Sequence, residues 1–582
     1  MRRTKIVCTI GPSTDSPERI AELIEAGMDV ARLNLSHGQR KEHCGRIELI
    51  RDVCRQLKKT VAILVDTRGP EVRTGSLRED AVFLEDGQDF VLTAAAVDGD
   101  ARRVSVTYPG LPRDLSPGHS VLIDDGLISL RVEAINGDDI FCRVIHGGEL
   151  RSYKGLNLPE ARLNLPALGE LDRADLRLAL EQEIHFIAAS FTRTREDILE
   201  IRRLIEEAGG EAAIIAKIES REGMVNFDSI LDVSDGMMVA RGDLGVEIPA
   251  EEVPLLQKKI IQQCNRAGKP VITATQMLDS MIRNPRPTRA EASDVANAIF
   301  DGTDAVMLSG ETAIGRFPLE AVRTMSRIAC RTEEALQFKN ILEVLEPAME
   351  KTVTDAISYA TCHTAQELEA QAIITSTQSG HTARMVSKYK PRAPIIAVTA
   401  RQRVAAQLKL TWGVYPVLYP PVESTDEMFT AAIRAALREE LIREGDMVVI
   451  TAGVPVGVSG TTNLLRVETV GEVLVKGTGI GKSALSGIAY VAGDHDPVAG
   501  IAEGQILVIR TTDREHLPAL EKAAAVVTEE GGLTSHGAIV ALNLGKPAVV
   551  GAESATDLIK TGDLITVDAV RGLIYRGKAN VL

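Results

Sequence analysis

The segment AIIAKIES, residues 213–220, carries an ammonium and a carboxylate two positions apart, at Lys217 and Glu219. It is an apolar run of strand length, and side chains alternate faces along a strand, so Lys217 and Glu219 point in the same direction. A purely structural buried strand would place Val, Ile or Leu at both positions. The pair therefore predicts a polar site, with a plain Lys217–Glu219 ion pair as the alternative interpretation.

A second carboxylate closes the next apolar run, GMMVARGD (236–243), at Asp243. Glu219 and Asp243 have no His or Cys beside them, so they suit a hard divalent cation, Mg²⁺ or Mn²⁺, rather than zinc. Two protein carboxylates leave coordination positions open for the phosphate or carboxylate oxygens of a substrate. Gly242 would let the backbone approach such a ligand closely. These residues predict a metal centre that also binds substrate.

The run VARLNLS (30–36) adds phosphate-binding and cation-binding groups. Its polar residues alternate with leucines and so face one side, where the Arg32 guanidinium can form two hydrogen bonds with a phosphoryl group. Neutral oxygens and one carboxylate from this run and the next form a pocket whose charge suits K⁺ better than a second Mg²⁺. Its members are Asn34, Ser36, Asp66 and Thr67. In this setting Lys217 would stabilise charge that develops during phosphoryl transfer.

Eight apolar runs of strand length precede residue 330, and amphipathic helical segments separate most of them. This alternation predicts an α/β fold, a (β/α)8 TIM barrel, in which catalytic groups lie at the C-terminal ends of the strands. The runs are residues 4–10, 30–36, 61–67, 185–191, 213–219, 236–243, 270–276 and 304–310. Further polar residues at the ends of these runs are Arg241, Thr273, Thr275, Ser309 and Glu311.

The rest of the chain divides by changes of pattern. Residues 1–68 and 169–339 form the barrel, and the short strands and hairpin patterns of 69–168 predict a small inserted β-barrel that acts as a lid over the catalytic face. Residues 340–470 predict a second α/β domain, beginning with a helix at 351–369. Residues 471–487 are rich in Gly and Ser and are typical of a linker. Residues 488–582 form a last domain.

A turn in the second α/β domain offers hydroxyls and backbone N–H groups between a strand and a helix that begins near His381. Such a turn can bind an anion, such as the phosphate of an effector. A simple N-cap turn rich in Ser and Thr explains the local pattern about as well. The candidate effector residues are Thr375, Ser376, Thr377, Ser379 and Gly380.

Composition excludes several classes of protein. The chain has 582 residues, 45% of them apolar and only 3% aromatic, and a formal charge of −15, which argues against nucleic-acid binding. Its seven cysteines are scattered without a CxxC pair, as in a reducing compartment rather than in a disulfide framework or a zinc site. The basic N-terminus reads as a strand and no apolar run has membrane-spanning length. We therefore expect a cytoplasmic protein with no membrane partner.

Long motifs resemble the pyruvate kinase family over the whole chain. They are KIVCTIGPS (5–13), ARLNLSHG (31–38), DTRGPEVRTG (66–75), AKIESREG (216–223), ARGDLGVEIP (240–249), ITATQMLDSM (272–281) and the run from 284 to 313. The resemblance implies transfer of the phosphoryl group of phosphoenolpyruvate to ADP, giving pyruvate and ATP. It also implies Mg²⁺ and K⁺ as cofactors, an allosteric effector domain and a homotetramer.

The resemblance also assigns roles residue by residue. Glu219 and Asp243 would bind the divalent metal, Arg32 the transferred phosphoryl group and Lys217 the enolate of pyruvate. Backbone N–H groups at Gly242 and Asp243, with the Thr275 hydroxyl, would hold the substrate carboxylate; the proton donor is left open. Residues that would contact the nucleotide phosphates are Arg73, His37 and Lys154. The K⁺ ligands would be Asn34, Ser36, Asp66 and Thr67, in agreement with the oxygen pocket above.

Three positions refine this assignment. Glu71 stands where glutamate accompanies dependence on K⁺ and lysine accompanies independence, so we expect dependence. Arg68 replaces a common lysine and keeps its charge. Gln378 stands where some members activated by fructose 1,6-bisphosphate carry lysine. This favours AMP or a sugar monophosphate such as ribose 5-phosphate as the effector.

The last domain contains GGLTSHGAIVALNLGKPAVVG, which resembles the swivelling phosphohistidine domain of phosphoenolpyruvate-utilising enzymes. His536 falls on the phosphorylated position. It is either a phosphoryl carrier or an idle residue of a domain kept for packing or regulation. The second interpretation is favoured, because direct transfer to ADP needs no carrier.

The sequence argues against two other functions. A phosphoenolpyruvate synthase-like phosphotransferase working through His536 would need a nucleotide-grasping domain for which no residues remain. A catalytically silent metabolite sensor would be free to lose the barrel residues Arg32, Lys217, Glu219 and Asp243, all of which are present.

Overall fold

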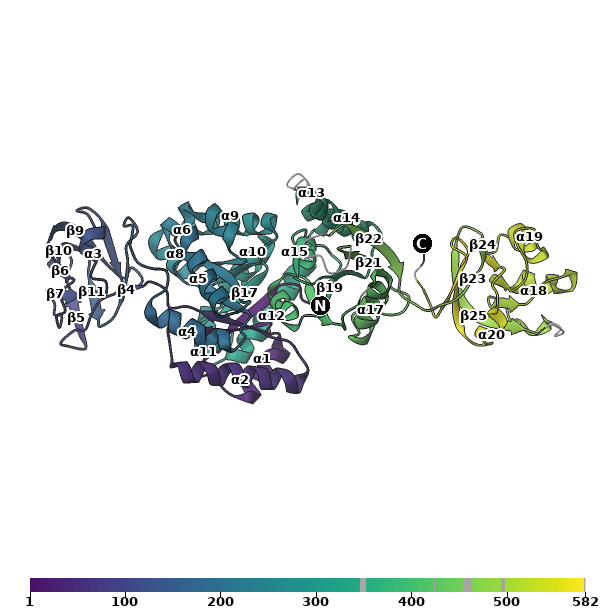
Figure 1. Cartoon of the computed structure of the whole chain (residues 1–582), viewed down its shortest axis with the longest axis horizontal. Helices are drawn as coiled ribbons and strands as arrows, with labels where there is room; N and C mark the ends of the chain where they lie inside the picture. Colours follow the sequence, from purple (N-terminus) through teal and green to yellow (C-terminus); the bar gives the residue numbers. More distant parts are fainter. Residues whose placement is uncertain (346–351, 423, 455–461, 494–497, 580, 582) are drawn as a thin grey trace. The chain divides into compact units, whose positions relative to one another are not determined.

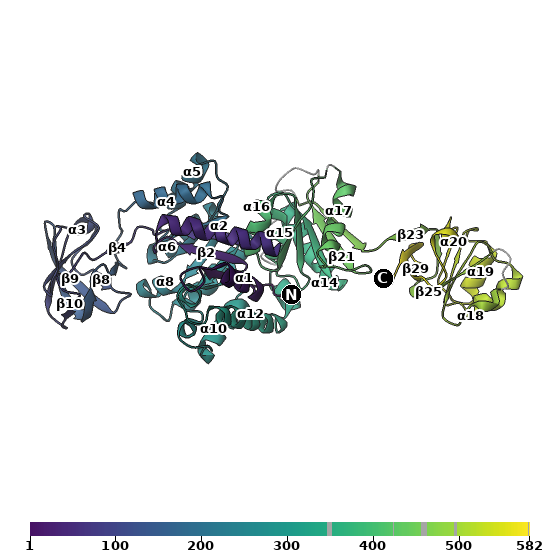
Figure 2. The same ribbon diagram turned by 90° about the horizontal axis from the view of Figure 1, so that it is seen from below.

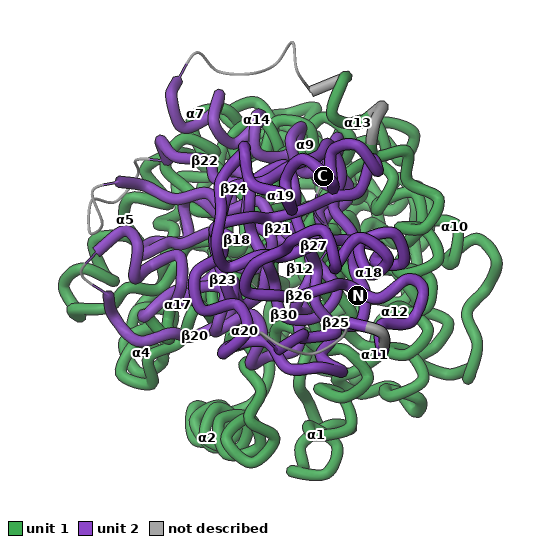
Figure 3. The backbone as a smooth tube through the Cα atoms, turned by 90° about the vertical axis from the view of Figure 1, so that its right-hand side faces the viewer, with its two compact units in different colours: residues 1–348, 387–390, 401–416 green, residues 349–386, 391–400, 417–582 purple. Residues whose placement is uncertain are grey.

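The computed structural model describes residues 1–345, 352–422, 424–454, 462–493, 498–579 and 581. The chain forms two compact units, coloured separately in Figure 3. The first comprises residues 1–348, 387–390 and 401–416, and the second comprises 349–386, 391–400 and 417–582. None of the described helices is both long enough and apolar enough to span a membrane.

Eight parallel strands of the first unit close into a barrel, as predicted, in the order β1-β17-β16-β15-β14-β13-β3-β2. Its interior is filled by aliphatic side chains such as Val7, Leu64, Ile215 and Met238, so the barrel is a packed core rather than a pore. The strands are β1 (Lys5–Thr9), β2 (Val30–Asn34), β3 (Ala62–Asp66), β13 (Phe186–Ala189), β14 (Ala213–Ile218), β15 (Gly236–Ala240), β16 (Val271–Ala274) and β17 (Ala305–Leu308).

Amphipathic helices surround the barrel (Figure 1). Several begin at a Ser or Thr side chain that caps the first turn, as Thr194 caps α5 by accepting a hydrogen bond from the Asp197 N–H. The helices are α1 (Pro17–Ala26), α2 (Arg40–Leu57), α4 (Glu170–Glu181), α5 (Arg195–Glu207), α6 (Arg221–Val225), α7 (Phe227–Val233), α8 (Arg241–Glu247), α9 (Val253–Ala267), α10 (Arg289–Phe300), α11 (Gly310–Ala313), α12 (Pro318–Glu334) and α13 (Phe338–Leu345).

The insertion after β3 is a small β-structure whose seven-stranded sheet runs in the order β4-β12-β8-β9-β10-β6-β7. A bridge between Thr74 and Val106 and the hydrogen bond from the Thr107 N–H to the Arg73 carbonyl join its two edges, which closes the sheet. The elements are β4 (Val72–Arg73), β5 (Ala81–Leu84), β6 (Asp89–Thr93), β7 (Arg103–Ser105), α3 (Leu111–Asp114), β8 (Ser120–Ile123), β9 (Ile128–Asn136), β10 (Asp139–His146), β11 (Gly148–Arg151) and β12 (Gly155–Asn157).

The segments 387–390 and 401–416, which the sequence assigned to the second α/β domain, belong instead to the barrel unit. They lie at the N-terminal ends of the strands, the base of the barrel. The buried Lys390 ammonium lies 3.0 Å from the Asp304 carboxylate, which also accepts the Trp412 N–H. Helix α16 (Gln402–Gln407) places Ala406 against the barrel interior. These polar and apolar contacts hold the segments to the barrel.

A five-stranded sheet runs in the order β20-β19-β18-β21-β22; β20 begins in the segment 401–416 of the first unit, and the other four strands belong to the second. The helix expected at 351–369 is α14 (Val353–Glu367); residue 351 lies outside the described residues. The other elements are β18 (Ala372–Ser376), α15 (His381–Ser387), β19 (Ile395–Thr399), β20 (Val414–Leu418), α17 (Thr425–Arg438), β21 (Met447–Ala452) and β22 (Leu464–Thr469).

The last region forms an eight-stranded sheet in the order β23-β30-β29-β25-β26-β27-β28-β24 (Figure 2). Its elements are β23 (Val473–Lys476), β24 (Thr478–Ile480), β25 (Ala484–Ala492), β26 (Ile506–Ile509), α18 (Leu517–Lys522), β27 (Ala525–Thr528), α19 (His536–Asn543), β28 (Ala548–Val550), α20 (Ala555–Leu558), β29 (Leu564–Asp568) and β30 (Leu573–Arg576).

The predicted linker at 471–487 is therefore wrong, because β23, β24 and the start of β25 lie within it. Its glycines serve close packing. A Cβ at Gly477 would lie 2.6 Å from the Val550 carbonyl oxygen, and one at Gly479 would lie 2.1 Å from that of Ala569. Glycine in a strand marks such close backbone approach as readily as it marks a flexible linker.

Candidate active site

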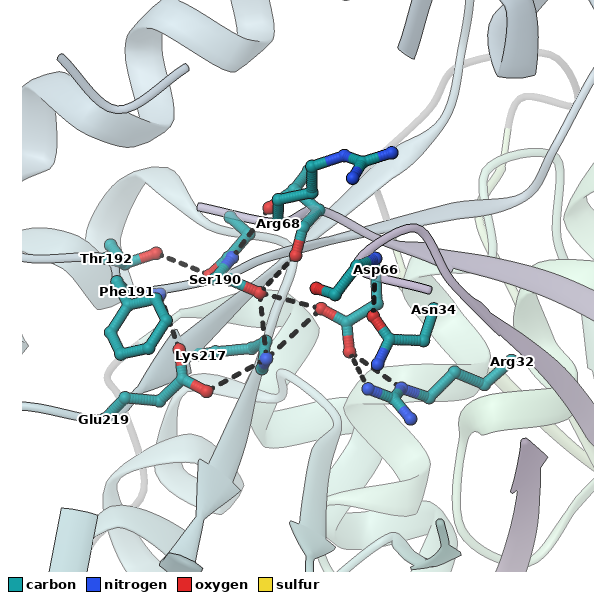
Figure 4. Close-up of polar contacts among 12 residues, drawn as sticks. Arg32, Asn34, Asp66, Arg68, Ser190, Phe191, Thr192, Lys217 and Glu219 are labelled. Atoms are coloured by element: carbon teal, nitrogen blue, oxygen red, sulfur yellow. Dashed lines mark hydrogen bonds and ion pairs between the residues drawn. The ribbon is translucent and has the colours of Figure 1, made fainter. Parts of the chain in front are cut away.

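Lys217 lies at the centre of a buried polar cluster at the C-terminal end of the barrel (Figure 4). Strand β14 carries it, and its Nζ donates to the Ser190 Oγ at 2.9 Å. The same Nζ lies 2.9 Å from Glu219 Oε1 and 3.2 Å from Asp66 Oδ1. Burial by itself would lower the pKa of Lys217, but the charges of Asp66 and Glu219 outweigh it and raise that pKa. The site therefore holds a permanent positive charge.

Asp66 fixes the two cations of this cluster in place. It is fully buried at the end of β3, and its Oδ2 accepts from Arg32 Nε at 2.7 Å. Its Oδ1 accepts from the Ser190 hydroxyl at 2.9 Å. Burial would raise the pKa of Asp66, but Arg32 and Lys217 overcome this and lower it. The guanidinium of Arg32 is thus held at the mouth of the barrel beside Lys217, with a further bond to Thr9.

Glu219 and Asp243 form a pair of neighbouring carboxylates. Glu219 follows β14, and its Oε2 accepts the Phe191 N–H at 2.5 Å; Asp243 lies in the first turn of α8. Burial, together with the nearby charge of Asp243, raises the pKa of Glu219 to about 7, against the attraction of Lys217. Burial likewise raises the pKa of Asp243. A buried and a partly buried carboxylate that resist ionisation together are a donor set that fits a divalent cation.

The Thr275 turn is a strained segment beside this pair. Thr275 and Gln276 have φ values of 66° and 53°, a conformation that β-branched residues rarely adopt. The Thr275 hydroxyl accepts the Gly242 N–H at 2.8 Å, and the Arg241 guanidinium donates to the Thr275 carbonyl at 2.8 Å. Backbone strain of this kind is found where a functional geometry must be maintained. The structure therefore brings Gly242, Asp243 and Thr275 together.

The predicted K⁺ residues lie at the C-terminal ends of β2 and β3, and the side-chain oxygens of Asn34, Asp66 and Thr67 already have protein partners. Asn34 Oδ1 accepts the Ser36 N–H at 3.1 Å, and Thr67 Oγ1 accepts the Ser190 N–H at 3.0 Å. Both Asp66 oxygens are engaged as described above. A monovalent ion would have to use the remaining lone pairs of these oxygens.

The predicted nucleotide residues are only partly brought together. A cavity between the insertion and the barrel is lined by Arg73, Lys154, Glu71 and Asp243, among others. The Arg73 guanidinium donates twice to Glu71 Oε2, at 3.0 and 2.6 Å, and Lys154 lies 2.9 Å from Asp124. His37 is exposed and does not line this cavity.

Other residues expected at the mouth have structural partners. The buried Glu311 carboxylate accepts the N–H groups of Leu278 and Ser309 at 3.1 and 2.7 Å, so it organises the loops after β16 and β17. The Thr273 hydroxyl donates to Thr303, which precedes β17 at the other end of the barrel. Arg68 pairs with Asp175, 3.2 Å away.

Ser190 was missed by sequence reasoning. Its hydroxyl contacts Lys217, Asp66 and the Thr67 carbonyl, the last at 2.6 Å. It directly follows strand β13, and a small hydroxyl residue after a strand is too common to indicate a functional role. The Phe191 N–H that binds Glu219 has no sequence signature, because every residue but proline has a backbone N–H.

The candidate effector turn follows β18. Thr377 Oγ1 accepts the Gly380 N–H at 2.9 Å, and the Ser376 hydroxyl lies 3.2 Å from the Tyr419 hydroxyl. The Thr375 hydroxyl is buried without a hydrogen-bond partner among the described residues. Thr377 thus caps the turn, as the simpler of the two interpretations requires, while an unsatisfied hydroxyl remains beside it.

His536 is the first residue of α19 and is half-buried. The Ser535 hydroxyl caps this helix by accepting the Ala538 N–H, and His536 Nδ1 lies 3.3 Å from the Thr512 hydroxyl. The ring is oriented by this one side-chain contact and is not enclosed.

Comparisons with known proteins give matches to one family along most of the chain. Residues 1–322 match the model described as "Pyruvate kinase, barrel domain", residues 355–468 match "Pyruvate kinase, alpha/beta domain", and residues 501–572 match "PEP-utilising enzyme, mobile domain". The chain is 54% identical to a pyruvate kinase of Geobacillus stearothermophilus and 53% identical to one of Bacillus licheniformis, over the full length of each chain.

A solved structure is similar as well. A crystal structure of a pyruvate kinase from Cryptosporidium parvum superposes with a TM-score of 0.77 at 41% identity, covering 80% of this chain and 96% of that one. The part of the chain that lies outside this superposition is of the size of the C-terminal domain.

Proposed function

The chain belongs to the pyruvate kinase family, and from this premise we propose which residues carry the reaction and which ions it requires. The reaction transfers the phosphoryl group of phosphoenolpyruvate to ADP and yields pyruvate and ATP. The observation that carries the assignment of residues is the buried Lys217 ammonium, held between Glu219 and Asp66 at 2.9 and 3.2 Å.

Arg32 and Lys217 stabilise the charge that moves during transfer. As the phosphoryl group leaves the enol oxygen of phosphoenolpyruvate for the terminal phosphate oxygen of ADP, negative charge develops on that enol oxygen. Lys217 stays protonated there, because its pKa is raised by two neighbouring carboxylates. Arg32, fixed by Asp66, offers its remaining N–H groups to the phosphoryl oxygens. A pre-set pair of cations needs no rearrangement as the charge moves.

The substrate carboxylate is held at the strained turn. The Gly242 N–H and the Thr275 hydroxyl, 2.8 Å apart, form one edge of its binding site with the N–H of Asp243. Arg241 keeps this turn in place through the Thr275 carbonyl and is a positioning residue. The proton that completes pyruvate comes from a donor that we leave unassigned.

Glu219 and Asp243 would hold Mg²⁺ or Mn²⁺. When bound, the ion supplies a Lewis acid that neutralises phosphate and carboxylate charge and orients the substrate. Both carboxylates have raised pKa values, and a cation that accepts both as ligands relieves their repulsion. Arg73 and Lys154 contact the phosphates of the nucleotide in the cavity under the insertion, with His37 as a further candidate.

K⁺ would be held by Asn34, Ser36, Asp66 and Thr67. Glu71 supports dependence on K⁺. Its carboxylate binds the Arg73 guanidinium, and glutamate, unlike lysine at this position, brings no positive charge of its own to the site. The test is pyruvate formation from phosphoenolpyruvate and ADP with Mg²⁺, in K⁺ and in a large organic cation. Activity that collapses without K⁺ supports the oxygen pocket. Equal activity in the two buffers would reject it, and a Glu71→Lys variant should then differ little from the wild type.

The remaining assignments concern regulation and assembly. The turn at 375–380 would bind the phosphate of AMP or ribose 5-phosphate, and the enzyme would act as a cytoplasmic homotetramer. Activation curves with each effector, repeated in Ser379→Ala, and light scattering of the purified enzyme test these statements.

His536 would take no part in the reaction. Incubation with phosphoenolpyruvate labelled in its phosphate should leave His536 unlabelled, and His536→Ala should keep the turnover of the wild type. Labelling of His536 together with slower turnover of the variant would make it a carrier.

A further inference from the structure

A basic cavity lies at the base of the barrel, at the opposite end of the strands from the catalytic residues. It is formed by the C-terminal end of α2, the residues that lead into β3 and β13, and helix α16. All of these belong to the first unit. The charged side chains that line it are Arg51, Arg55, Lys58, Lys59 and Arg403, with Glu183 as the single acid. Five cations against one carboxylate are unusual in a chain whose formal charge is −15.

Most of this positive charge is not neutralised by the protein. Arg55 pairs with Asp52 on the same helix, and Arg403 lies 3.6 Å from Glu211. Arg51 donates to the carbonyl of Gln182, which carries no charge. Across the described residues, Arg51, Lys58 and Lys59 form no ion pair. Three cations on one cavity therefore lack a counter-charge.

The pKa of His185 reflects the electrostatic potential inside the cavity. Its Nδ1 accepts the Ile63 N–H at 2.9 Å, which leaves the proton of the neutral ring on Nε2. Burial and then the charges of Arg51 and Arg403 lower its pKa to about 4. Both guanidiniums disfavour a positive charge on this ring, so the ring lies in a region that favours an anion.

The floor of the cavity is apolar. It consists of Ile50, Cys54, Val61, Ile63 and Ala406, of which the two isoleucines and the valine are β-branched and the other two are small. A bare inorganic anion would leave this surface uncovered. A ligand that joins an apolar or planar body to a doubly charged anionic group would use both the floor and the cations.

We propose that this cavity binds the phosphate monoester of a small metabolite, with the phosphate at Arg51, Arg403 and Lys59 and the body over Ile50, Cys54 and Ala406. The site is separate from the effector turn at 375–380, which shares no residue with it. Since the cavity lies at the end of the barrel away from Lys217, any effect of binding on turnover would be transmitted through the strands.

Site-resolved lysine footprinting tests this on the wild-type full-length enzyme. The enzyme is acylated with a lysine reagent, alone or with AMP, ribose 5-phosphate, inorganic phosphate or adenosine, and labelling is read by peptide mass spectrometry. At a ligand concentration ten times Kd, labelling of Lys58 and Lys59 should fall roughly tenfold. Lys41, exposed on the same helix, should be labelled equally throughout. Lys154 reports binding at the catalytic site separately.

Comparing the added compounds shows which kind of phosphate-bearing ligand the cavity binds. Protection by AMP and by ribose 5-phosphate means that the phosphate and any apolar body suffice, whereas protection by AMP alone means a nucleoside monophosphate. Protection by adenosine as well as AMP would overturn the role of the cations. Labelling of Lys58 and Lys59 that no phosphate compound reduces would overturn the site.

Variants give a second measurement that does not depend on the label. Arg51→Met combined with Lys59→Gln should weaken binding of the protecting compound at least about tenfold by calorimetry. Arg331→Met, an exposed arginine outside the cavity, is the matched control. Lys59→Gln alone changes an exposed side chain, so it keeps the test valid if the double variant does not fold. Equal affinity in Lys59→Gln, the double variant and the control would contradict the proposal.

Discussion

The two ends of one barrel use buried charge in opposite ways. At the base, each buried carboxylate has strong partners: Asp304 accepts Lys390 and two backbone N–H groups, of Trp412 and Val271, at 3.0 to 3.1 Å. At the mouth, Glu219 and Asp243 are neighbours, and the Lys217 ammonium interacts electrostatically with both carboxylates. Asp304 is therefore compensated by its protein partners, whereas the carboxylate pair at the mouth is not fully compensated.

The pKa values of the carboxylates follow this difference. Burial would raise the pKa of Asp29 at the base, but Arg2 and Lys5 outweigh burial and lower it. The pKa values of Glu219 and Asp243 at the mouth are raised instead. The comparison teaches that burial of charge does not identify a functional site. An incompletely compensated group of charges does, because it is stable only when a ligand completes it.

The two buried lysines show the same contrast from the cationic side. Lys217 lies between two carboxylates, and its pKa is raised. Lys390 has Asp304 alone, burial outweighs that attraction, and its pKa is lowered. The same substitution at each position therefore separates a catalytic charge from a structural one.

Lys217→Met should have the largest effect. Without the ammonium, charge on the enol oxygen is not stabilised, and kcat should fall about 10³-fold. Pyruvate formation measures this, and Mn²⁺ binding followed by electron paramagnetic resonance is the control, since Glu219 and Asp243 remain. A variant with more than a tenth of the wild-type kcat would make Lys217 structural.

Lys390→Met should leave the chemistry alone and reduce stability. It leaves Asp304 buried without its counter-charge, which costs about 3 to 5 kcal/mol of unfolding free energy. Urea denaturation measures the loss, and kcat of the folded variant should stay within about twofold of the wild type, as expected for a residue of the base. A large fall in kcat at unchanged stability would erase the distinction between the two ends.

The carboxylate pair at the mouth should make metal binding depend on pH. Glu219 has a pKa of about 7 in the metal-free protein and must lose its proton to bind a cation. The apparent affinity for Mn²⁺ should therefore fall as the pH drops below 7, approaching about tenfold for each pH unit well below that value. Affinity that is constant between pH 5.5 and 8 would contradict the raised pKa.

Glu219 also makes the stability of the metal-free protein depend on pH. Because its folded-state pKa lies above its ordinary value of 4.5, ionisation of Glu219 destabilises the metal-free fold. Its contribution is fully present below pH 4.5 and is lost as the pH rises through 7. Mg²⁺ should therefore raise Tm more at pH 8 than at pH 6, and Glu219→Gln should remove most of this difference.

Ser190→Ala should have the smallest effect. The variant loses the hydroxyl that positions Lys217 and Asp66, so kcat should fall about tenfold with little change in KM for phosphoenolpyruvate. Thr303→Val at the base also removes a buried hydroxyl and should change stability only. Equal kinetic effects of the two variants would mean that Ser190 acts through packing.

Much of the site could be read from residue types and alternation along strands. Lys217 and Glu219 two positions apart on an apolar run, and Arg32 among leucines, predicted a cluster at strand ends, and the structure places all three there. The eight runs predicted the closed barrel for the same reason: strand alternation and helical amphipathicity are local properties of sequence.

Other features could not be predicted because they depend on contacts between distant segments. Gly477 and Gly479 looked like a linker, and only the carbonyls of Val550 and Ala569 show that Gly477, between β23 and β24, and Gly479, within β24, are closely packed. The segment 401–416 looked like part of the second α/β domain, and only Asp304, more than a hundred residues away, shows where it docks.

The sequence by itself determined the barrel, the identity of the charged residues and the face of each strand on which they lie, since these follow from chain order and side-chain period. Only the tertiary structure decided how those charges are compensated. It set Ser190 between Lys217 and Asp66, left Glu219 and Asp243 short of positive charge, and, within the described part of the chain, gave Arg51 and Lys59 no ion pair. Compensation is a matter of distance in space, and a buried charge has its pKa and its function set by the few groups within reach of it.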